Sequence, residues 1–231
     1  MSIALVQSKA GGSGSGATTA TSTAVGYTSA TTAGNLLILV ACADGDSSVS
    51  ISTPVTSGFT WTSATTEPWS DTTGTSYGRT TIFYIANASA MSTLTTTTVG
   101  ATGGTTFTDV GFTLYEFSGV ATTSAVDVTA IQNNNTATLT TPTTANLSTT
   151  ATDLIFVAMA AENTAGTAGA GYTLGVASPS LVGVAQYILN QASGSISTAF
   201  GGTSNYWACA AVSFKSSGGV KFGGGMPVCL M

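Results

Sequence analysis

The sequence predicts an all-β protein, a β-sandwich of jelly-roll or concanavalin-like type with very little helix. Two apolar runs, LLILVACA at residues 36–43 and LIFVAMAA at residues 154–161, have the length of buried central strands and are too short to cross a bilayer as helices. No stretch keeps a 3.6-residue apolar period over the length of a helix. Roughly ten to fourteen short β-prone segments, separated by turns that contain Gly and Pro, are typical of a sandwich or barrel.

Turn-forming residues divide the chain into segments with the composition of strands. In the first half we expect strands at residues 3–7, 18–25, 36–43, 49–51, 59–62, 79–86, 94–99 and 112–117. Residues 67–78, rich in Pro, Asp, Thr and Gly, are expected to form a loop. In the second half we expect strands at residues 126–131, 136–141, 154–161, 184–189 and 206–214.

The order of these features repeats, which predicts an internal duplication within one sandwich that covers residues 1–215. The pseudo-repeats run from about 18 to 120 and from 126 to 215, and the second one is shorter. The alternative is that any sandwich rich in Thr and Gly produces strands that look alike.

The central runs predict the core. Alternate residues of a strand face opposite sides, so residues 36–43 present two apolar rows, and a long loop or a neighbouring subunit must cover the second row. The residues expected to be almost fully buried are Ile38, Val40, Ile82, Phe156, Ala158 and Phe214.

Composition excludes several functions. Charged residues make up 6% of the chain, against about 25% in ordinary domains, and the net charge is −5 with four basic residues. We therefore expect no nucleic-acid partner and no membrane partner. The chain has no histidine, the commonest general base and metal ligand, and no phosphate-binding glycine loop. We expect no enzyme, no cofactor and no metal.

The cysteines do not suggest a disulfide scaffold. Cys42 and Cys209 lie in apolar strand patterns and are expected to be free and buried, with a bridge between them as the alternative, and Cys229 lies near the end. The first residues lack the pattern of a secretory signal peptide.

Aromatic residues near two carboxylates form one candidate site. Glu67 and Asp71 lie close to Trp61, Trp69 and Tyr77, a composition that fits a glycosidase pair or a glycan-binding platform. The alternative reading is packing of the aromatic rings in the core or against the loop.

Two further acidic features have structural interpretations. The sequence Asp44-Gly45-Asp46 resembles a fragment of a calcium loop without its downstream glutamate, so a turn at a strand end is favoured. Glu116, within an apolar strand, would need a partner if it were buried, and Arg79 is the candidate, as a structural pair.

The composition of residues 216–231 predicts a C-terminal tail that docks on a protein surface. Glycines at two places in this segment allow the backbone to bend, and its final residues are apolar. We expect it to dock on a neighbouring subunit, with folding back on its own sandwich as the alternative. The anchors are Phe222, Met226, Val228, Leu230 and Met231.

The chain resembles a loose group of Thr/Gly/Ser-rich β-sandwich virion proteins of tailed bacteriophages. The resemblance is spread over residues 34–215 and rests on segments such as GNLLILVACADG, RTTIFYIANAS, FTLYEFSGV and TDLIFVAMAAEN. It implies a virion structural protein, a capsid decoration or tail-appendage subunit that is made in the host cytoplasm and assembles with its own copies and other virion proteins. A carbohydrate-binding or receptor-binding module is the alternative function.

Overall fold

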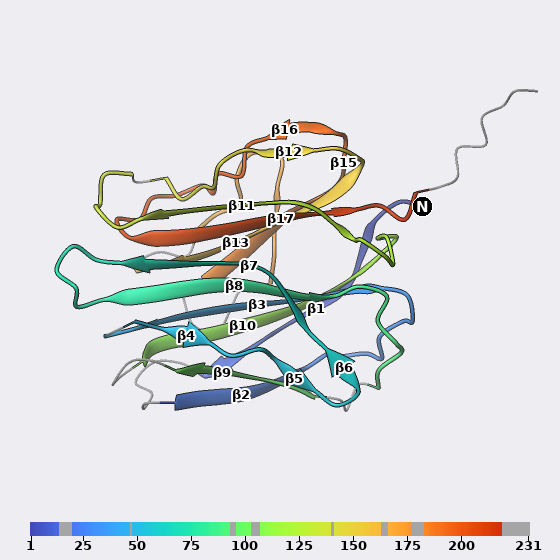
Figure 1. The fold of residues 1–231 in the computed structure, drawn as a ribbon, viewed down its shortest axis with the longest axis horizontal. Helices are drawn as coiled ribbons and strands as arrows, with labels where there is room; N and C mark the ends of the chain where they lie inside the picture. Colours follow the sequence, from blue (N-terminus) through green and yellow to red (C-terminus); the bar gives the residue numbers. More distant parts are fainter. Residues whose placement is uncertain are drawn as a thin grey trace, which may run out of the picture.

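The computed structural model confirms an all-β chain in which two large antiparallel sheets pack face to face as a β-sandwich (Figure 1). It describes residues 1–13, 20–46, 48–92, 96–102, 107–139, 141–162, 166–176 and 183–218. Within these ranges no helix is long and apolar enough to cross a bilayer.

Each half of the chain supplies one of the two large sheets. The first sheet has the order β1 (Ala4–Ser13), β10 (Phe107–Ser118), β3 (Leu36–Gly45), β8 (Tyr77–Ile85) and β7 (Thr62–Ser70). The second sheet has the order β11 (Val126–Asn134), β17 (Trp207–Lys215), β13 (Asp153–Ala161), β15 (Gly183–Gln191) and β14 (Thr173–Leu174). The two predicted central runs are thus the middle strands β3 and β13.

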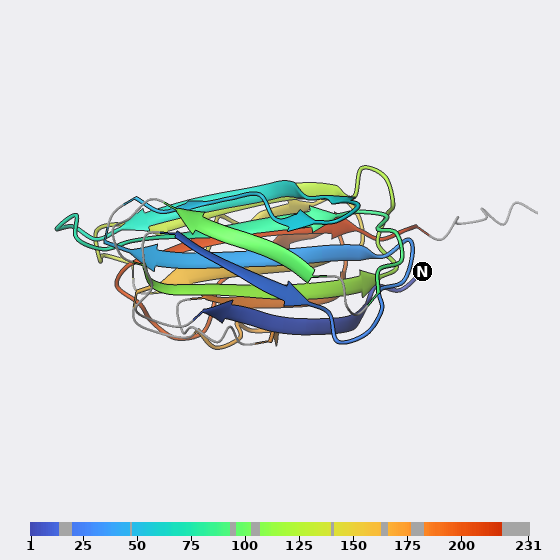
Figure 2. The same cartoon turned by 90° about the horizontal axis from the view of Figure 1, so that it is seen from below.

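Two smaller layers cover the outer faces of the sandwich. Outside the first sheet lie β2 (Ala20–Gly26), β9 (Thr96–Thr102), β5 (Val55–Thr56) and β6 (Phe59–Thr60), with β4 (Ser50–Ile51) paired to β9. Figure 2 shows β2 and β9 crossing the first sheet obliquely. Outside the second sheet lies the pair of β12 (Leu147–Thr149) and β16 (Gly194–Ile196). The chain itself therefore covers the second apolar row of β3.

In the described part of the chain the layers enclose three hydrophobic cores, and every residue of β3 and β13 is buried. The inner core lies between the two large sheets, and the first and second outer cores lie beneath the small layers. In β3, Ile38 faces the inner core and Leu37 the first outer core. The six residues predicted as core are all 3% exposed or less, which confirms that prediction.

Some predicted segment boundaries were wrong. Residues 67–70 belong to β7, because the Thr-rich stretch before them pairs with β8 and Pro68 is tolerated in an edge strand. Residues 136–139 form no strand, since Asn134 accepts hydrogen bonds from Thr136 N (3.4 Å) and Oγ1 (3.3 Å) and holds a turn there.

The two sheets share one strand order. Taken in chain order, β1, β3, β7, β8 and β10 occupy the same sheet positions as β11, β13, β14, β15 and β17. Two asparagines in the left-handed region lie at the ends of matching strands, with φ of 54° at Asn87, two residues after β8, and 56° at Asn190, the residue before the last of β15. If the first repeat is defined by the strands of the first sheet, it includes β1, which lies before the predicted start of that repeat at about residue 18. The duplication itself stays a prediction.

Candidate functional site

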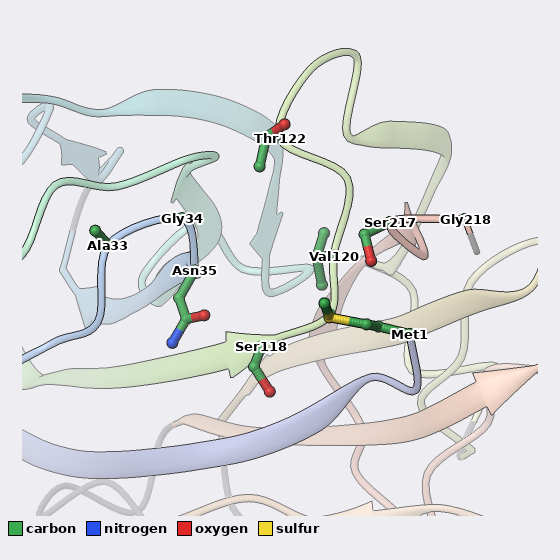
Figure 3. A pocket seen from close by; sticks show the side chains of 10 residues that line it. Met1, Ala33, Gly34, Asn35, Ser118, Val120, Thr122, Ser217 and Gly218 are labelled. Carbon is green, nitrogen blue, oxygen red and sulfur yellow. The ribbon is translucent and has the colours of Figure 1, made fainter. Parts of the chain in front are cut away.

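A pocket opens at the end of the sandwich where the first residues, the β10–β11 connection and the end of β17 meet (Figure 3). Its volume is about 430 Å³, and none of the described residues that line it has a charged side chain. The lining residues are Met1, Ala33, Gly34, Asn35, Ser118, Gly119, Val120, Thr122, Ser217 and Gly218. This chemistry suits an apolar or neutral group.

Backbone contacts hold in place the segments that line this pocket. Gly119 has a φ of 76°, and a Cβ there would collide with the carbonyl oxygen of Ser2, so the chain needs glycine at this turn. Ser217 N donates to Gly119 O (2.7 Å) and Ser216 N donates to Thr152 O (2.9 Å). The segment after Lys215 is therefore fixed to the domain as far as Ser217.

The predicted tail begins at this pocket. Gly218, on the rim, is the last described residue. Phe222, Met226, Val228, Leu230 and Met231 lie outside the described residues, as does Cys229. The prediction that these anchors dock on a neighbouring subunit stays a prediction.

The three aromatic residues of the glycan prediction do not share a surface. Trp61 is 4% exposed in the first outer core and donates Nε1–H to Thr56 Oγ1 (2.9 Å). Trp69 is 2% exposed in the inner core, stacked on Tyr206 with ring centroids 6.4 Å apart. Tyr77 is half-buried against the first outer core. The first sheet thus separates Trp69 from the other two rings, an arrangement that agrees with the packing alternative.

The neighbouring carboxylates have separate structural surroundings. Glu67 is 9% exposed and accepts a hydrogen bond from Asn133 Nδ2 (2.7 Å). Burial raises the pKa of Glu67, while Asn133 and the Arg79 charge oppose the shift. Asp71 accepts hydrogen bonds from Thr73 and Thr75 in an exposed turn, and the Thr73 hydroxyl is the main cause that lowers its pKa. Each carboxylate is thus held by hydrogen-bond donors of its own, Glu67 by Asn133 and Asp71 by Thr73 and Thr75.

Two of three consecutive asparagines, Asn133 and Asn135, tie the sheets together, a role that the sequence did not predict. Besides Glu67, Asn133 Nδ2 donates to Pro68 O (3.0 Å), and Ser70 N donates to Asn135 Oδ1 (3.0 Å). Asn134 Nδ2 donates to Leu139 O (2.6 Å) and to Asn205 O. The end of β11 is thereby fixed to β7 of the facing sheet. The signal in the sequence was the run of three asparagines itself, whose side chains both donate and accept.

Glu116 is completely buried, but its predicted partner is wrong. The carboxylate accepts hydrogen bonds from Thr32 N (2.8 Å) and Asn35 Nδ2 (2.6 Å) on Oε1 and from Gln7 Nε2 (2.7 Å) on Oε2. Glu116 pairs with Leu37 of β3 and Arg79 with Ala43 of the same strand. Six residues of strand, ~20 Å, separate those two positions along β3.

A second buried acidic cluster joins β11, β13 and β17. Asp153 at the start of β13 is completely buried, neither of its carboxyl oxygens has a hydrogen-bond partner, and burial raises its pKa to about 6. Thr150 donates its N–H (2.6 Å) and its Oγ1–H (2.7 Å) to Asp127. The sequence analysis assigned no role to either aspartate. Asp153 has no exposed surface, whereas Asp127 is half-buried.

The remaining candidate residues are structural. Cys42 and Cys209 are free and buried, which confirms the first of the two predictions for them. Burial raises the pKa of Cys42 to about 12, so its thiol stays protonated. Asp44 is a buried residue of β3, and in the described part of the chain no group of three or more His, Cys, Asp or Glu side chains is arranged to hold a metal ion.

The chain matches no known family model, no curated protein sequence and no solved structure. The resemblance to phage virion proteins consequently remains an expectation from the sequence.

Proposed function

We propose that this chain is a non-enzymatic virion structural protein, a capsid decoration or tail-appendage subunit. It assembles with its own copies and with other virion proteins through faces of the sandwich and through the apolar segment 220–231, after synthesis in the host cytoplasm. The observation that carries this proposal is a pocket of about 430 Å³, with no charged side chain among its described lining residues, beside Gly218 and thus close to that segment in the chain.

The described side chains support a structural role. The buried carboxylates Glu67 and Glu116 and the half-buried Asp127 hold loops and strands to one another through hydrogen bonds. The tryptophans Trp61 and Trp69 fill cores and present no exposed face to a sugar. A carbohydrate-binding module, the alternative function, gains no support from these positions.

The apolar segment supplies chemistry that fits assembly. Phe222, Met226, Val228, Leu230 and Met231 carry no charge, and complete burial of a Phe or Leu side chain contributes about 1.5–3 kcal/mol. Several such anchors offset the conformational entropy that a short segment loses on docking.

The test is a variant that ends at Gly218, because Ser216 and Ser217 bond to the domain and should be kept. The matched control keeps the full length and replaces Phe222, Met226, Val228, Leu230 and Met231 with serine. Thermal melts establish that each variant folds, and sedimentation velocity and co-purification with virus particles measure assembly. We expect both variants to fold but to lose self-association and binding to particles. Assembly equal to that of the full chain in both variants would refute the proposal.

A further inference from the structure

The walls of the pocket beside Gly218 are held in place by the described part of the domain itself. Ala121 N donates to Lys215 O (2.9 Å), which fixes the β10–β11 connection to the end of β17. Val120 and Ser216 form an isolated antiparallel bridge next to this hydrogen bond. Because the walls are ordered in advance, an occupant binds without the entropic cost of ordering them.

The described lining of this pocket suits an apolar side chain. Figure 3 shows that the lining comes from four separate segments of the chain, to which Met1, Ala33 and Val120 contribute apolar side chains. The Asn35 amide is already in use, because its Nδ2 donates to the buried carboxylate of Glu116 (2.6 Å). The volume of about 430 Å³ lies within the range of about 300–1,000 Å³ that is usual for sites that bind organic groups.

The chain carries matching side chains directly after this pocket. Gly218 lines the pocket, and Lys221 is the one charged residue in the sequence that follows it. At about 3.3 Å per extended residue, Phe222 lies within roughly 13 Å of Gly218 and Met226 within roughly 26 Å. The segment 220–231 therefore has the composition and the reach to fill a pocket of this kind.

A second copy is favoured over the parent domain as the owner of the pocket that the segment fills. Phe222 and Met231 are nine residues apart, up to about 30 Å of extended chain, so one pocket of about 430 Å³ holds only a part of the apolar side chains between them. A segment folded back on its own domain would leave the others next to water. Between two domain ends that face each other, these side chains are covered from both sides.

We propose that this pocket receives an apolar side chain of segment 220–231 from a second copy of the chain, and that two copies exchange their segments about a twofold axis. This inference rests on the proposed function, since it names the surface on which the segment docks in self-assembly. The pocket and the start of the segment lie at the same end of the domain. Two copies that meet at this end each offer a segment to the pocket of the other, so the contact closes as a dimer and does not continue as an open chain.

Substitutions in the pocket test this contact without changing the segment. Thr122 is exposed and lines the pocket, so the indole of Thr122→Trp should occupy it. Thr123 is equally exposed but is not among the lining residues, and Thr123→Trp is the matched control. Ala33→Trp, at an exposed residue of another lining segment, is the second pocket variant and decides if the first fails to fold.

Sedimentation equilibrium measures the Kd of the dimer for each variant. We expect each pocket variant to raise this Kd by about ten- to a hundredfold, the factor that burial of one large apolar side chain supplies. The Thr123→Trp control should dimerise like the wild-type chain.

A mixture of two defective chains tests the exchange itself. The variant that ends at Gly218 keeps the pocket but lacks the segment, whereas Thr122→Trp keeps the segment but has a blocked pocket. Only a pair with one copy of each retains a segment in an open pocket. We therefore expect native mass spectrometry of the mixture to show this heterodimer in excess over both homodimers.

Three outcomes would overturn the proposal. They are wild-type dimerisation of the folded pocket variants, absence of the heterodimer, and a wild-type chain that stays monomeric while truncation at Gly218 exposes the pocket amides to hydrogen exchange. The last of these would show that the segment fills its own pocket. Loss of particle binding on truncation, together with wild-type dimerisation of the pocket variants, would reject this inference and keep the proposed function. Truncation without any effect on assembly would reject both.

Discussion

The environment of Glu116 leads to a prediction with a magnitude that can be worked out from the structure. In Glu116→Gln one of the two carboxylate oxygens becomes an NH₂ group of almost the same size. Thr32 N and Asn35 Nδ2 both donate to Oε1, so the new amide satisfies them best by keeping its oxygen there. Its NH₂ group then faces Gln7 Nε2, which is also a donor.

Gln7 cannot relieve this conflict without a loss elsewhere. Rotating its amide by 180° would turn Oε1 toward position 116, but that oxygen already accepts a hydrogen bond from Ser29 N (3.0 Å). A buried donor left without a partner costs about 1–3 kcal/mol, and hydrogen bonds to a charged group are worth about 1.5–3 kcal/mol. We therefore expect Glu116→Gln to lower the free energy of unfolding by about 1.5–3 kcal/mol.

Urea denaturation at pH 7 measures this loss. With a slope of about 2–3 kcal/mol per molar urea, the midpoint should fall by about 0.5–1.5 M at an unchanged slope. The combination with Arg79→Gln serves as the control, because additivity within about 0.5 kcal/mol is expected for residues that do not touch. A loss below about 0.5 kcal/mol, or strong coupling to Arg79, would show that the three neutral donors do not hold Glu116.

Two further predictions concern packing. Ile38→Ala, in the inner core, should lower the free energy of unfolding by about 2–5 kcal/mol in denaturant melts. Val55→Ala, at a position 69% exposed, should change it by less than about 0.5 kcal/mol. Equal effects of the two substitutions would contradict the central position of β3 in the sandwich. Gly78→Ala should cost about 1–3 kcal/mol and alter the tryptophan fluorescence, because the added Cβ would collide with the indole of Trp69; an unchanged spectrum and melt would contradict that contact.

The apolar strands were predictable from the sequence because their signal is local. Residues 36–43 are an uninterrupted apolar run, and a run of that length needs cover on both faces wherever it lies in a sheet. The partners of Glu116 were not predictable in this way. Gln7 lies 109 residues away and Asn35 lies 81 residues away, and only the order β1-β10-β3 brings them to one carboxylate. Strand order is a property of the whole chain and leaves no local mark.

The tryptophans show how one inserted residue changes a site. Trp61 and Trp69 are an even number of residues apart, so an unbroken strand would place both on one face. The pairing of β7 with β8 shifts by one residue between Ser63 and Thr65. A shift of one residue moves every later side chain to the other face, which puts Trp69 in the inner core and leaves Trp61 in the first outer core. Thr-rich sequence around residue 64 gives no sign of this bulge.

The predicted duplication gains its strongest support from details that sheet architecture does not require. Antiparallel sheets with five strands are common, so a shared strand order has limited weight by itself. A non-glycine residue in the left-handed region is uncommon, yet Asn87 and Asn190 adopt it at matching places in YIAN and YILN. In this position the Asn190 side chain bonds to Ile3, the residue before β1 of the other half, accepting from Ile3 N (2.6 Å) and donating to Ile3 O (2.9 Å). If the halves share an origin, Asn35 and Asp153 mark a place where they differ, because each stands directly before a leucine that pairs with a phenylalanine of the neighbouring strand, Leu36 with Phe117 and Leu154 with Phe214.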